Sequence, residues 1–294
     1  MCDYERGISM LGNIDKLNDI FRDRGYDFTV KTETVVKNNS QIEGLVICGD
    51  SFSACPVYYP DDDFISSDEE DQVRIIKQIR DDYAADIDIG MVMNRDYILD
   101  NVYPRLVSET NLDMVRDADI VYRPFLDMLI EYYVVIPSPQ DGAYTSYTIR
   151  GSHLVMNDLY ENDIFHKSLV NLVKQIVIIP INRILAKYTD ETELPEMEIY
   201  VLTNKSQLFG ASVILLDVLL QEVGQILGEP YIIFPSSIHE CIAVGFNYSL
   251  DLNEALAMVK EINENAVAID ERLTNSVYIC ENGFLSVFNG RNRN

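Results

Sequence analysis

Basic residues are scarce in this chain. Only 23 lysines and arginines stand against 48 aspartates and glutamates, and the formal net charge is −25 at pH 7. A surface of this charge repels phosphate backbones and anionic lipid. The charge balance therefore disfavours nucleic-acid binding, docking on an anionic membrane and acidic partners. Taken alone, it indicates solubility rather than a particular fold.

Close cysteine pairs and long apolar runs are also missing. The longest apolar runs, 176–181 and 213–220, fall far below the ~20 residues that span a bilayer. The first residues, Met1–Arg6, carry acids where a secretory signal needs basic residues. By elimination, we expect a cytoplasmic protein. Its five scattered cysteines lack the density of a disulfide scaffold and are expected to be reduced thiols: Cys2, Cys48, Cys55, Cys241 and Cys280.

Recognisable catalytic and cofactor motifs are absent from the sequence. The three histidines, His153, His166 and His239, have no close cysteine or aspartate partners at metal-ligand spacing. The run Asp61–Asp63 lacks the glycine and the glutamate of a calcium loop. No P-loop, dinucleotide fingerprint, zincin helix or Gly-x-Ser-x-Gly elbow occurs. We therefore expect no metal and no cofactor.

The residues that are present predict an α+β fold with mixed sheets and flanking helices, in up to two subdomains. With 294 residues, 47% of them hydrophobic, the chain can bury one large or two modest cores. We place an N-terminal α+β region over 1–108 and a C-terminal α+β region, which carries the distinctive motifs, over 109–290.

Helical and strand periodicities place the elements of the N-terminal region. We expect a helix over 11–21, a hairpin over 28–36 and 41–48, and a third strand over 55–59. Ser66 and Ser67 each precede a glutamate by three residues. Because this is the spacing of a capping box, a helix is expected to start there.

The same periodicities divide the C-terminal region. Extended structure is expected over 102–137, broken by a helical turn near 111–115, and a second hairpin leads to a strand over 143–149. The expected helices are 152–159, 163–179, an apolar helix buried on most sides within 210–227, and 252–265. The expected strands are 198–203, 231–234, 241–245 and a terminal hairpin over 276–288.

A first polar motif follows the strand predicted over 198–203. Asn204, Lys205 and Ser206 stand between this strand and the apolar helix. Free N–H groups at a helix start, together with Lys205, can hold an anion. Alternatively, Asn204 or Ser206 only caps the helix. Because both are preferred cap residues, the structural interpretation is favoured.

A second polar motif follows the strand predicted over 231–234 and contains Ser236, Ser237, His239 and Glu240. These are the groups of a nucleophilic site, since a histidine can activate a hydroxyl. However, Ser237 and His239 are two residues apart and do not face each other in a helical turn. Ser237 and Glu240 have capping-box spacing, which favours a one-turn helix start between two strands.

The two motifs share a site only if their strands run in the same direction. If the strands around Val201 and Ile233 are parallel, both motifs lie at the carboxyl edge of one sheet; if they are antiparallel, the motifs lie at opposite ends. We expect these strands and the strand around Ala243 to share a sheet. The candidate ligand-binding residues at its edge are Asn204, Lys205, Ser236, Ser237, His239 and Glu240.

Six segments of the chain together carry a family resemblance. They are Pro56–Tyr59, Val102–Val107, Arg123–Asp127, Tyr200–Ser206, Phe209–Ala211 and Pro235–Glu240. In this order they resemble a bacterial family of unknown function, domain of unknown function 5688. The resemblance covers 41–287 and is strongest in the two late motifs. It implies no activity, because the family is functionally uncharacterised.

Two functions from different classes are compatible with these residues. A non-catalytic cytoplasmic protein that binds an unknown small ligand or protein partner is favoured, because no catalytic signature is assembled. The alternative is a hydrolase-like enzyme that uses Ser236 or Ser237 with His239 and a carboxylate such as Glu240. Such an enzyme needs a hydroxyl within hydrogen-bond reach of His239 and a nearby pair of free N–H donors.

Overall fold

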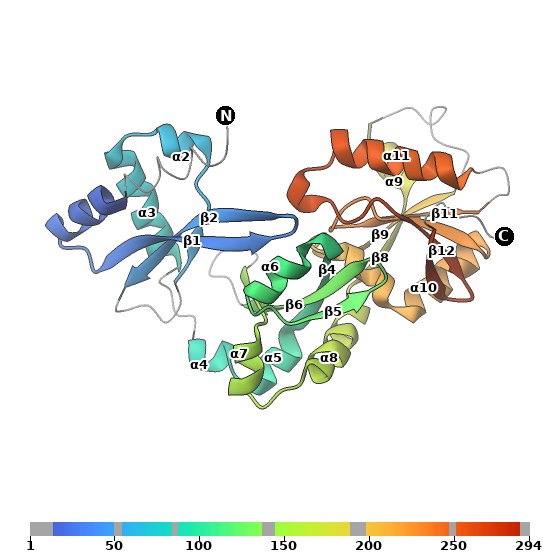
Figure 1. Cartoon of the computed structure of the whole chain (residues 1–294), viewed down its shortest axis with the longest axis horizontal. Coiled ribbons are helices and arrows are strands. Elements are labelled where there is room, and N and C mark those ends of the chain that lie inside the picture. The colour runs from blue at the N-terminus through green and yellow to red at the C-terminus, as the bar shows by residue number, and fades with distance from the viewer. Residues whose placement is uncertain are drawn as a thin grey trace. The chain divides into compact units, whose positions relative to one another are not determined.

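The computed structural model describes residues 14–49, 55–83, 88–136, 145–188, 198–246 and 251–288 (Figure 1). The chain divides into two compact units. Unit 1 comprises Met1–Tyr97 and Ile136–Thr145, and unit 2 comprises Ile98–Val135 and Ser146–Asn294. The α+β class is confirmed. The domain boundary placed between residues 108 and 109 stays a prediction.

Unit 1 contains a three-stranded sheet in the order β1-β2-β3. The predicted hairpin is confirmed: β1 (Phe28–Lys37) and β2 (Ser40–Gly49) pair antiparallel around a turn in which Asn39 has a left-handed φ of 55°. β3 (Val57–Tyr58) pairs with β2. Residues 14–23 are helical, and their buried side chains pack with the hairpin and α3 (Glu69–Tyr83). The remaining short helices are α2 (Asp62–Ser66) and α4 (Ile89–Val92).

The predicted capping of α3 by serine is wrong. α3 begins at Glu69, and the backbone N–H of Asp71 donates to Asp68 Oδ1 over 2.9 Å. The hydroxyls of Ser66 and Ser67 instead donate to backbone carbonyls within α2. These serines therefore lie at the C-terminal end of α2, and Asp68 caps the N-terminus of α3. Aspartate and serine are equally favourable N-cap residues.

A second sheet has the order β4-β6-β5, with β7 also paired to β6. Its strands are β4 (Val102–Ser108), β5 (Tyr122–Phe125), β6 (Met128–Ile136) and β7 (Thr145–Thr148). The helical turn expected near 111–115 is present as the 3₁₀ helix η1 (Glu109–Asn111) and α6 (Leu112–Asp117). The flanking helices are α5 (Arg95–Asn101), α7 (Gly151–Met156) and α8 (Glu161–Val173).

The third sheet has six strands in the order β13-β12-β10-β11-β9-β8. They are β8 (Ile176–Pro180), β9 (Ile199–Asn204), β10 (Tyr231–Phe234), β11 (Cys241–Gly245), β12 (Val277–Glu281) and β13 (Phe284–Phe288). The predicted common sheet for Val201, Ile233 and Ala243 is thus confirmed. The prediction of mixed sheets is wrong, because neighbouring strands of this sheet are antiparallel. β9 and β10 run in the same direction, but β11 lies between them and pairs antiparallel with each.

Two helices cover opposite faces of the six-stranded sheet (Figure 1). Ile232 packs against Ala255 and Val259 of α11 (Leu252–Asn265), which has its predicted bounds. The adjacent Tyr231 points the other way, and its hydroxyl donates to the carbonyl of Leu220 in α10 (Asp217–Leu227) over 2.9 Å. Because successive side chains of a strand point to opposite faces, the sheet is buried on both sides.

The helix predicted over 163–179 ends earlier, at Val173. Residues 176–180 form β8, the edge strand that pairs with β9, and α9 (Ile181–Leu185) follows. The run from Ile176 to Ile179 is β-branched throughout, which favours a strand once a sheet edge is available to pair with it. The helical spacing of apolar residues continued into this run by coincidence, so the sequence predicted a helix that was too long.

The apolar helix predicted within 210–227 is divided. Gly210–Leu215 form the 3₁₀ helix η3, and Leu216, in extended conformation, separates it from α10. η3 is buried on most sides, as expected, but α10 is not, since Val218 is 52% exposed. Gly228 ends α10 with a left-handed φ of 78°, as predicted for a C-terminal glycine.

No helix in the described ranges of the chain has the length and apolar character needed to cross a bilayer.

Candidate functional site

The carboxyl ends of β9 and β10 lie at the same edge of the six-stranded sheet. Each strand pairs antiparallel with β11, which lies between them, so β9 and β10 run in the same direction. This is the direction that a shared edge requires, although the strands are second neighbours. The polar motif after β9 and the polar motif before β11 therefore leave the sheet together.

Three hydrogen bonds hold the two motifs against each other. Thr203 Oγ1 donates to the carbonyl of His239 over 2.8 Å. The backbone N–H of Phe209 donates to Nδ1 of the His239 imidazole over 3.2 Å. The N–H of Ala211 donates to the carbonyl of Ile238 over 3.3 Å. Residues 27 to 36 positions apart in the sequence thus form one connected edge.

The first motif is a turn rather than a helix start. Asn204 Nδ2 donates to the carbonyl of Leu208 over 2.8 Å, and Ser206 Oγ donates to Asn204 Oδ1 over 3.0 Å. The N–H groups of Lys205, Gln207 and Leu208 donate to Gln175 O, Asn204 O and Ser206 Oγ, respectively. These amides are therefore satisfied by the protein. The favoured interpretation, that Asn204 or Ser206 caps a helix, is therefore wrong, and an anion site at this turn stays a prediction.

The second motif is a tight turn between β10 and β11. Ser236 Oγ and Ser237 Oγ both donate to Glu240 Oε1, over 2.7 and 2.9 Å. The N–H of His239 donates back to Ser237 Oγ over 2.9 Å. The predicted one-turn helix is wrong, because a side-chain turn, in which a hydroxyl accepts from the N–H two residues later, satisfies the same groups without helical backbone.

The imidazole of His239 belongs to a stack of side chains. Its ring is stacked on the Phe209 ring, with a centroid distance of 5.9 Å and an interplanar angle of 22°. The Arg105 guanidinium lies 5.3 Å from the centroid of the same phenylalanine ring, and the Tyr133 ring lies 5.2 Å from it. On the far side, His239 Nε2 lies 3.7 Å from Glu271 Oε1, in the 3₁₀ helix η4 (Ile269–Glu271).

Phe209 at the centre of this stack has an unusual backbone. Its φ is 55°, a left-handed conformation that is rare for a bulky residue and costs about 1–3 kcal/mol. The hydrogen bond to His239 and the ring contacts with Arg105 and Tyr133 hold it there. Such strain is concentrated at functional sites, and it marks this stack as the candidate site.

A buried ion pair holds the Arg105 side chain of this stack in place. Arg105 lies directly opposite Glu131 on the β4–β6 ladder, and its Nη2 and Nε atoms donate to Glu131 Oε2 over 2.6 and 2.9 Å. The Glu131 side chain is only 3% exposed and the Arg105 side chain 17%. Arg105 also donates to Thr148 Oγ1 over 3.2 Å. The guanidinium is therefore fixed where it meets the Phe209 ring.

Comparison with known sequences places both motifs in one family. The sequence model of a family of unknown function, DUF5688, matches residues 14–281. The chain belongs to this family. The predicted resemblance is confirmed, and the match begins before Gln41, so the helix over 14–23 is part of the DUF5688 region as well. No curated protein and no solved structure matches the chain.

The predicted site residues of this DUF5688 chain fall into three groups. Ser236, Ser237 and Glu240 bond to one another, and Asn204 orders its own turn. His239 alone presents a partly exposed ring at the shared edge. Lys205 is exposed, and within the described part of the chain its ammonium has no ion pair. Sequence reasoning missed Arg105, Glu131 and Glu271 as site residues, because their approach depends on strand register and on η4.

Gly210 allows the two motifs of the DUF5688 chain to approach. A Cβ atom there would lie 2.1 Å from Thr203 Oγ1, 2.4 Å from His239 O and 2.8 Å from Asn204 N. We predict that Gly210→Ala lowers the free energy of unfolding by about 1–3 kcal/mol, because the motifs must separate. Urea unfolding measures it. The control is Gly245→Ala, whose Cβ would meet its nearest atom at 3.5 Å; an equal loss in both variants would contradict the steric argument.

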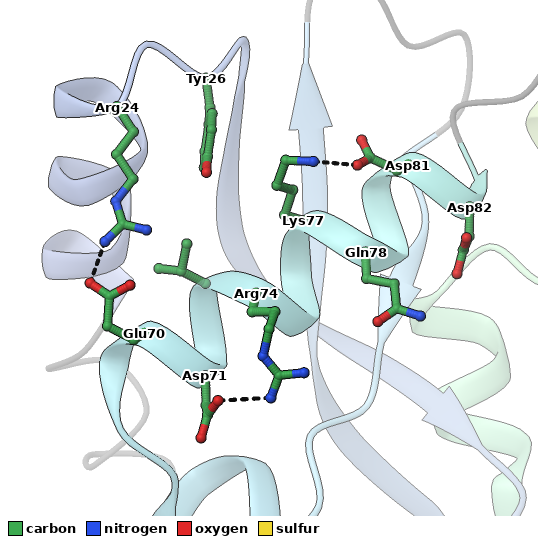
Figure 2. A pocket seen from close by; sticks show the side chains of 10 residues that line it. Arg24, Tyr26, Glu70, Asp71, Arg74, Lys77, Gln78, Asp81 and Asp82 are labelled. Atoms are coloured by element: carbon green, nitrogen blue, oxygen red, sulfur yellow. Dashed lines mark hydrogen bonds and ion pairs between the residues drawn. The ribbon is translucent and has the colours of Figure 1, made fainter.

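A separate concavity lies in unit 1 and was not predicted. A cavity of about 620 Å³ lies between Tyr26 and α3, and Figure 2 shows Arg24 and Tyr26 facing that helix. Its basic side chains pair with acidic neighbours: Arg24 with Glu70, Arg74 with Asp71 at 2.7 Å, and Lys77 with Asp81 at 2.5 Å. The lining therefore carries nearly balanced charge. The only indication of this cavity in the sequence was the helical spacing of the ion pairs on α3.

The described parts of the DUF5688 chain contain no group of three or more histidine, cysteine, aspartate or glutamate residues placed to hold a metal ion.

Proposed function

We propose that the chain is a non-catalytic, cytoplasmic binding or interaction protein, and that a partner contacts the His239–Glu271 edge of the six-stranded sheet. The observation that carries the proposal is the use of the motif hydroxyls. Both serine hydroxyls donate to Glu240, while the two imidazole nitrogens of His239 face Phe209 N and Glu271. Serines and histidine thus build a fixed surface rather than a nucleophile and its base.

The charge of this edge indicates the chemistry of the partner. The Glu271 side chain is 48% exposed and lies beside a partly exposed imidazole. The chain as a whole carries a formal charge of −25, which attracts cations over long range and repels anions. A small ligand or protein segment with an ammonium or guanidinium group fits this edge, since the cation contacts Glu271 and its hydrocarbon stem contacts the imidazole ring.

The hydrolase alternative is less well supported. A nucleophilic serine needs a histidine nitrogen within hydrogen-bond reach to take its proton. Here Nδ1 of His239 accepts from the N–H of Phe209, and Ser237 Oγ donates to Glu240 rather than to the imidazole ring. Both serine hydroxyls donate to the same carboxylate oxygen, Glu240 Oε1, so neither hydroxyl proton is directed at the His239 ring.

A serine-directed fluorophosphonate tests the absence of catalysis. We expect no labelling of the native chain at neutral pH, because an unactivated hydroxyl does not attack the reagent. Labelling of the native chain that disappears in Ser236→Ala or Ser237→Ala, and also in His239→Gln, would establish the enzyme and overturn the proposal.

A tetralysine peptide tests the charge of the partner. The imidazole signals of the three histidines can be followed by NMR, with the His239 signal assigned from His239→Gln. We expect tetralysine, and not tetraglutamate, to shift the His239 signal. Glu271→Gln should weaken binding about 1.5- to 5-fold, because an exposed ion pair contributes ~0.2–1 kcal/mol.

The matched control for tetralysine is Glu261→Gln, which removes the same charge from an exposed position on α11. It should leave the affinity unchanged. Equal shifts at His153, His166 and His239, or equal weakening by both glutamine variants, would show that the peptide binds through the net charge of the chain rather than at the His239–Glu271 edge.

A further inference from the structure

Two of the five cysteines lie directly opposite each other in unit 1. β2 and β3 pair Leu45 with Tyr58 and Val46 with Val57. The N–H of Ile47 donates to the carbonyl of Pro56 over 3.0 Å, which continues the same register by one pair. The next pair in this register is Cys48 and Cys55. Although scattered in the sequence, these thiols are cross-strand neighbours.

The geometry of this position suits a disulfide. In an antiparallel ladder, the pair next to a hydrogen-bonded pair has its Cα atoms about 4.5 Å apart, within the ~4.4–6.8 Å range of disulfides. Ile47 and Pro56 form the hydrogen-bonded pair, so Cys48 and Cys55 occupy the closer type of position. Burial and the neighbouring Cys55 thiol both raise the pKa of Cys48, in agreement with this register.

A small molecule can reach the thiols. Leu45 and Ile47 point into the buried core of unit 1, so the alternation along β2 directs Cys48 to the other face. A cavity of about 720 Å³ is lined by both Cys48 and Cys55. This volume is within the range that accommodates small ligands. Cys55 is exposed and Cys48 partly buried, which makes Cys55 the thiol that an incoming reagent meets first.

The cysteines of the six-stranded sheet differ from this pair. Cys241 and Cys280 are fully buried. Burial raises the pKa of the Cys241 thiol, and its sulfur lies 3.9 Å from the carbonyl of Ala211. A buried, protonated thiol reacts slowly with disulfides, because the thiolate is the nucleophile. These two residues are therefore internal references for reactivity.

We propose that Cys48 and Cys55 are a redox-active dithiol, which a low-molecular-weight disulfide such as glutathione disulfide converts into an intramolecular disulfide. The Cys55 thiolate attacks one sulfur of glutathione disulfide, an S–S bond forms, and one glutathione thiolate leaves. The Cys48 thiolate then attacks Cys55 Sγ and the second glutathione thiolate leaves. The two thiol protons pass to the departing thiolates, and two electrons pass from the protein to glutathione.

Peptide mass spectrometry of the full chain tests this reaction. Cys48 and Cys55 share one tryptic peptide, residues 38–74, because no lysine or arginine lies between Lys37 and Arg74. After exposure of the native chain to glutathione disulfide, alkylation and digestion, we expect this peptide to be lighter by two hydrogens and to carry no alkyl group. Dithiothreitol should restore both alkylation sites. Cys241 and Cys280 should remain protected from glutathione throughout.

Single variants separate the two thiol roles. Cys48→Ser should keep glutathione attached to Cys55, because no second thiol displaces it. Cys55→Ser should take up no glutathione at Cys48. Circular dichroism checks that both variants fold. If a variant does not fold, the result for the native chain still tests the proposal. Free alkylation of both cysteines after oxidation, a stable glutathione adduct on native Cys55, or disulfides only between chains would each overturn the proposal.

Discussion

Replacing Arg105 by methionine is expected to lower the free energy of unfolding by about 3–5 kcal/mol, because it leaves the buried Glu131 carboxylate without its cation. The Glu131 side chain is 3% exposed, and both hydrogen bonds described for its carboxylate come from Arg105. Methionine preserves much of the apolar length of the side chain, so the loss measures the charge rather than a cavity. Urea unfolding followed by circular dichroism gives the difference.

A double-mutant cycle is the control for Arg105→Met. Combining it with Glu131→Gln removes the buried charge as well as the cation, and part of the lost stability should return. Losses that simply add in the double variant would show that the two side chains do not interact. Arg105→Met should also shift the His239 imidazole signal, because the guanidinium no longer lies over the Phe209 ring on which His239 stacks.

Truncation of Leu219 is expected to have a comparable effect. Leu219→Ala should cost about 2–5 kcal/mol, since it truncates a fully buried side chain of α10 and leaves a cavity. The same unfolding experiment measures it. The adjacent Val218 is 52% exposed on the same helix. Val218→Ala should therefore remain within about 0.5 kcal/mol of the native chain; equal losses at both positions would contradict the burial of Leu219.

Elements with local signals were predicted well from the sequence. Asn39 and the Asn282–Gly283 pair adopt left-handed conformations in two of the three predicted hairpin turns, and the turn before residue 143 lies outside the described residues. The helix Leu252–Asn265 has its predicted bounds, and Asp251 caps it by accepting from the N–H of Asn253. In each case, the residues that specify the turn or the cap are within a few positions of the backbone that they order, so no distant contact is needed.

The site was predicted only in part, because it depends on contacts between distant segments. The serine, histidine and glutamate of the second motif were identified, but their mutual bonds follow from a tight turn that spacing alone read as a helix. Arg105 and Glu131 meet through the register of β4 and β6, and Glu271 reaches His239 from η4. Nothing in the local sequence of these residues specifies those partners.

The sequence by itself determined the α+β class, most strands, the hairpin turns and the family, because these follow from periodicity, turn chemistry and motif order. Tertiary structure alone decided that β11 runs between β9 and β10, that 176–180 is a strand, and that Cys48 faces Cys55. Each of these outcomes is a strand pairing between segments separated in the chain. The free energy of such a pairing depends on which edge is available, and that is a property of the assembled fold.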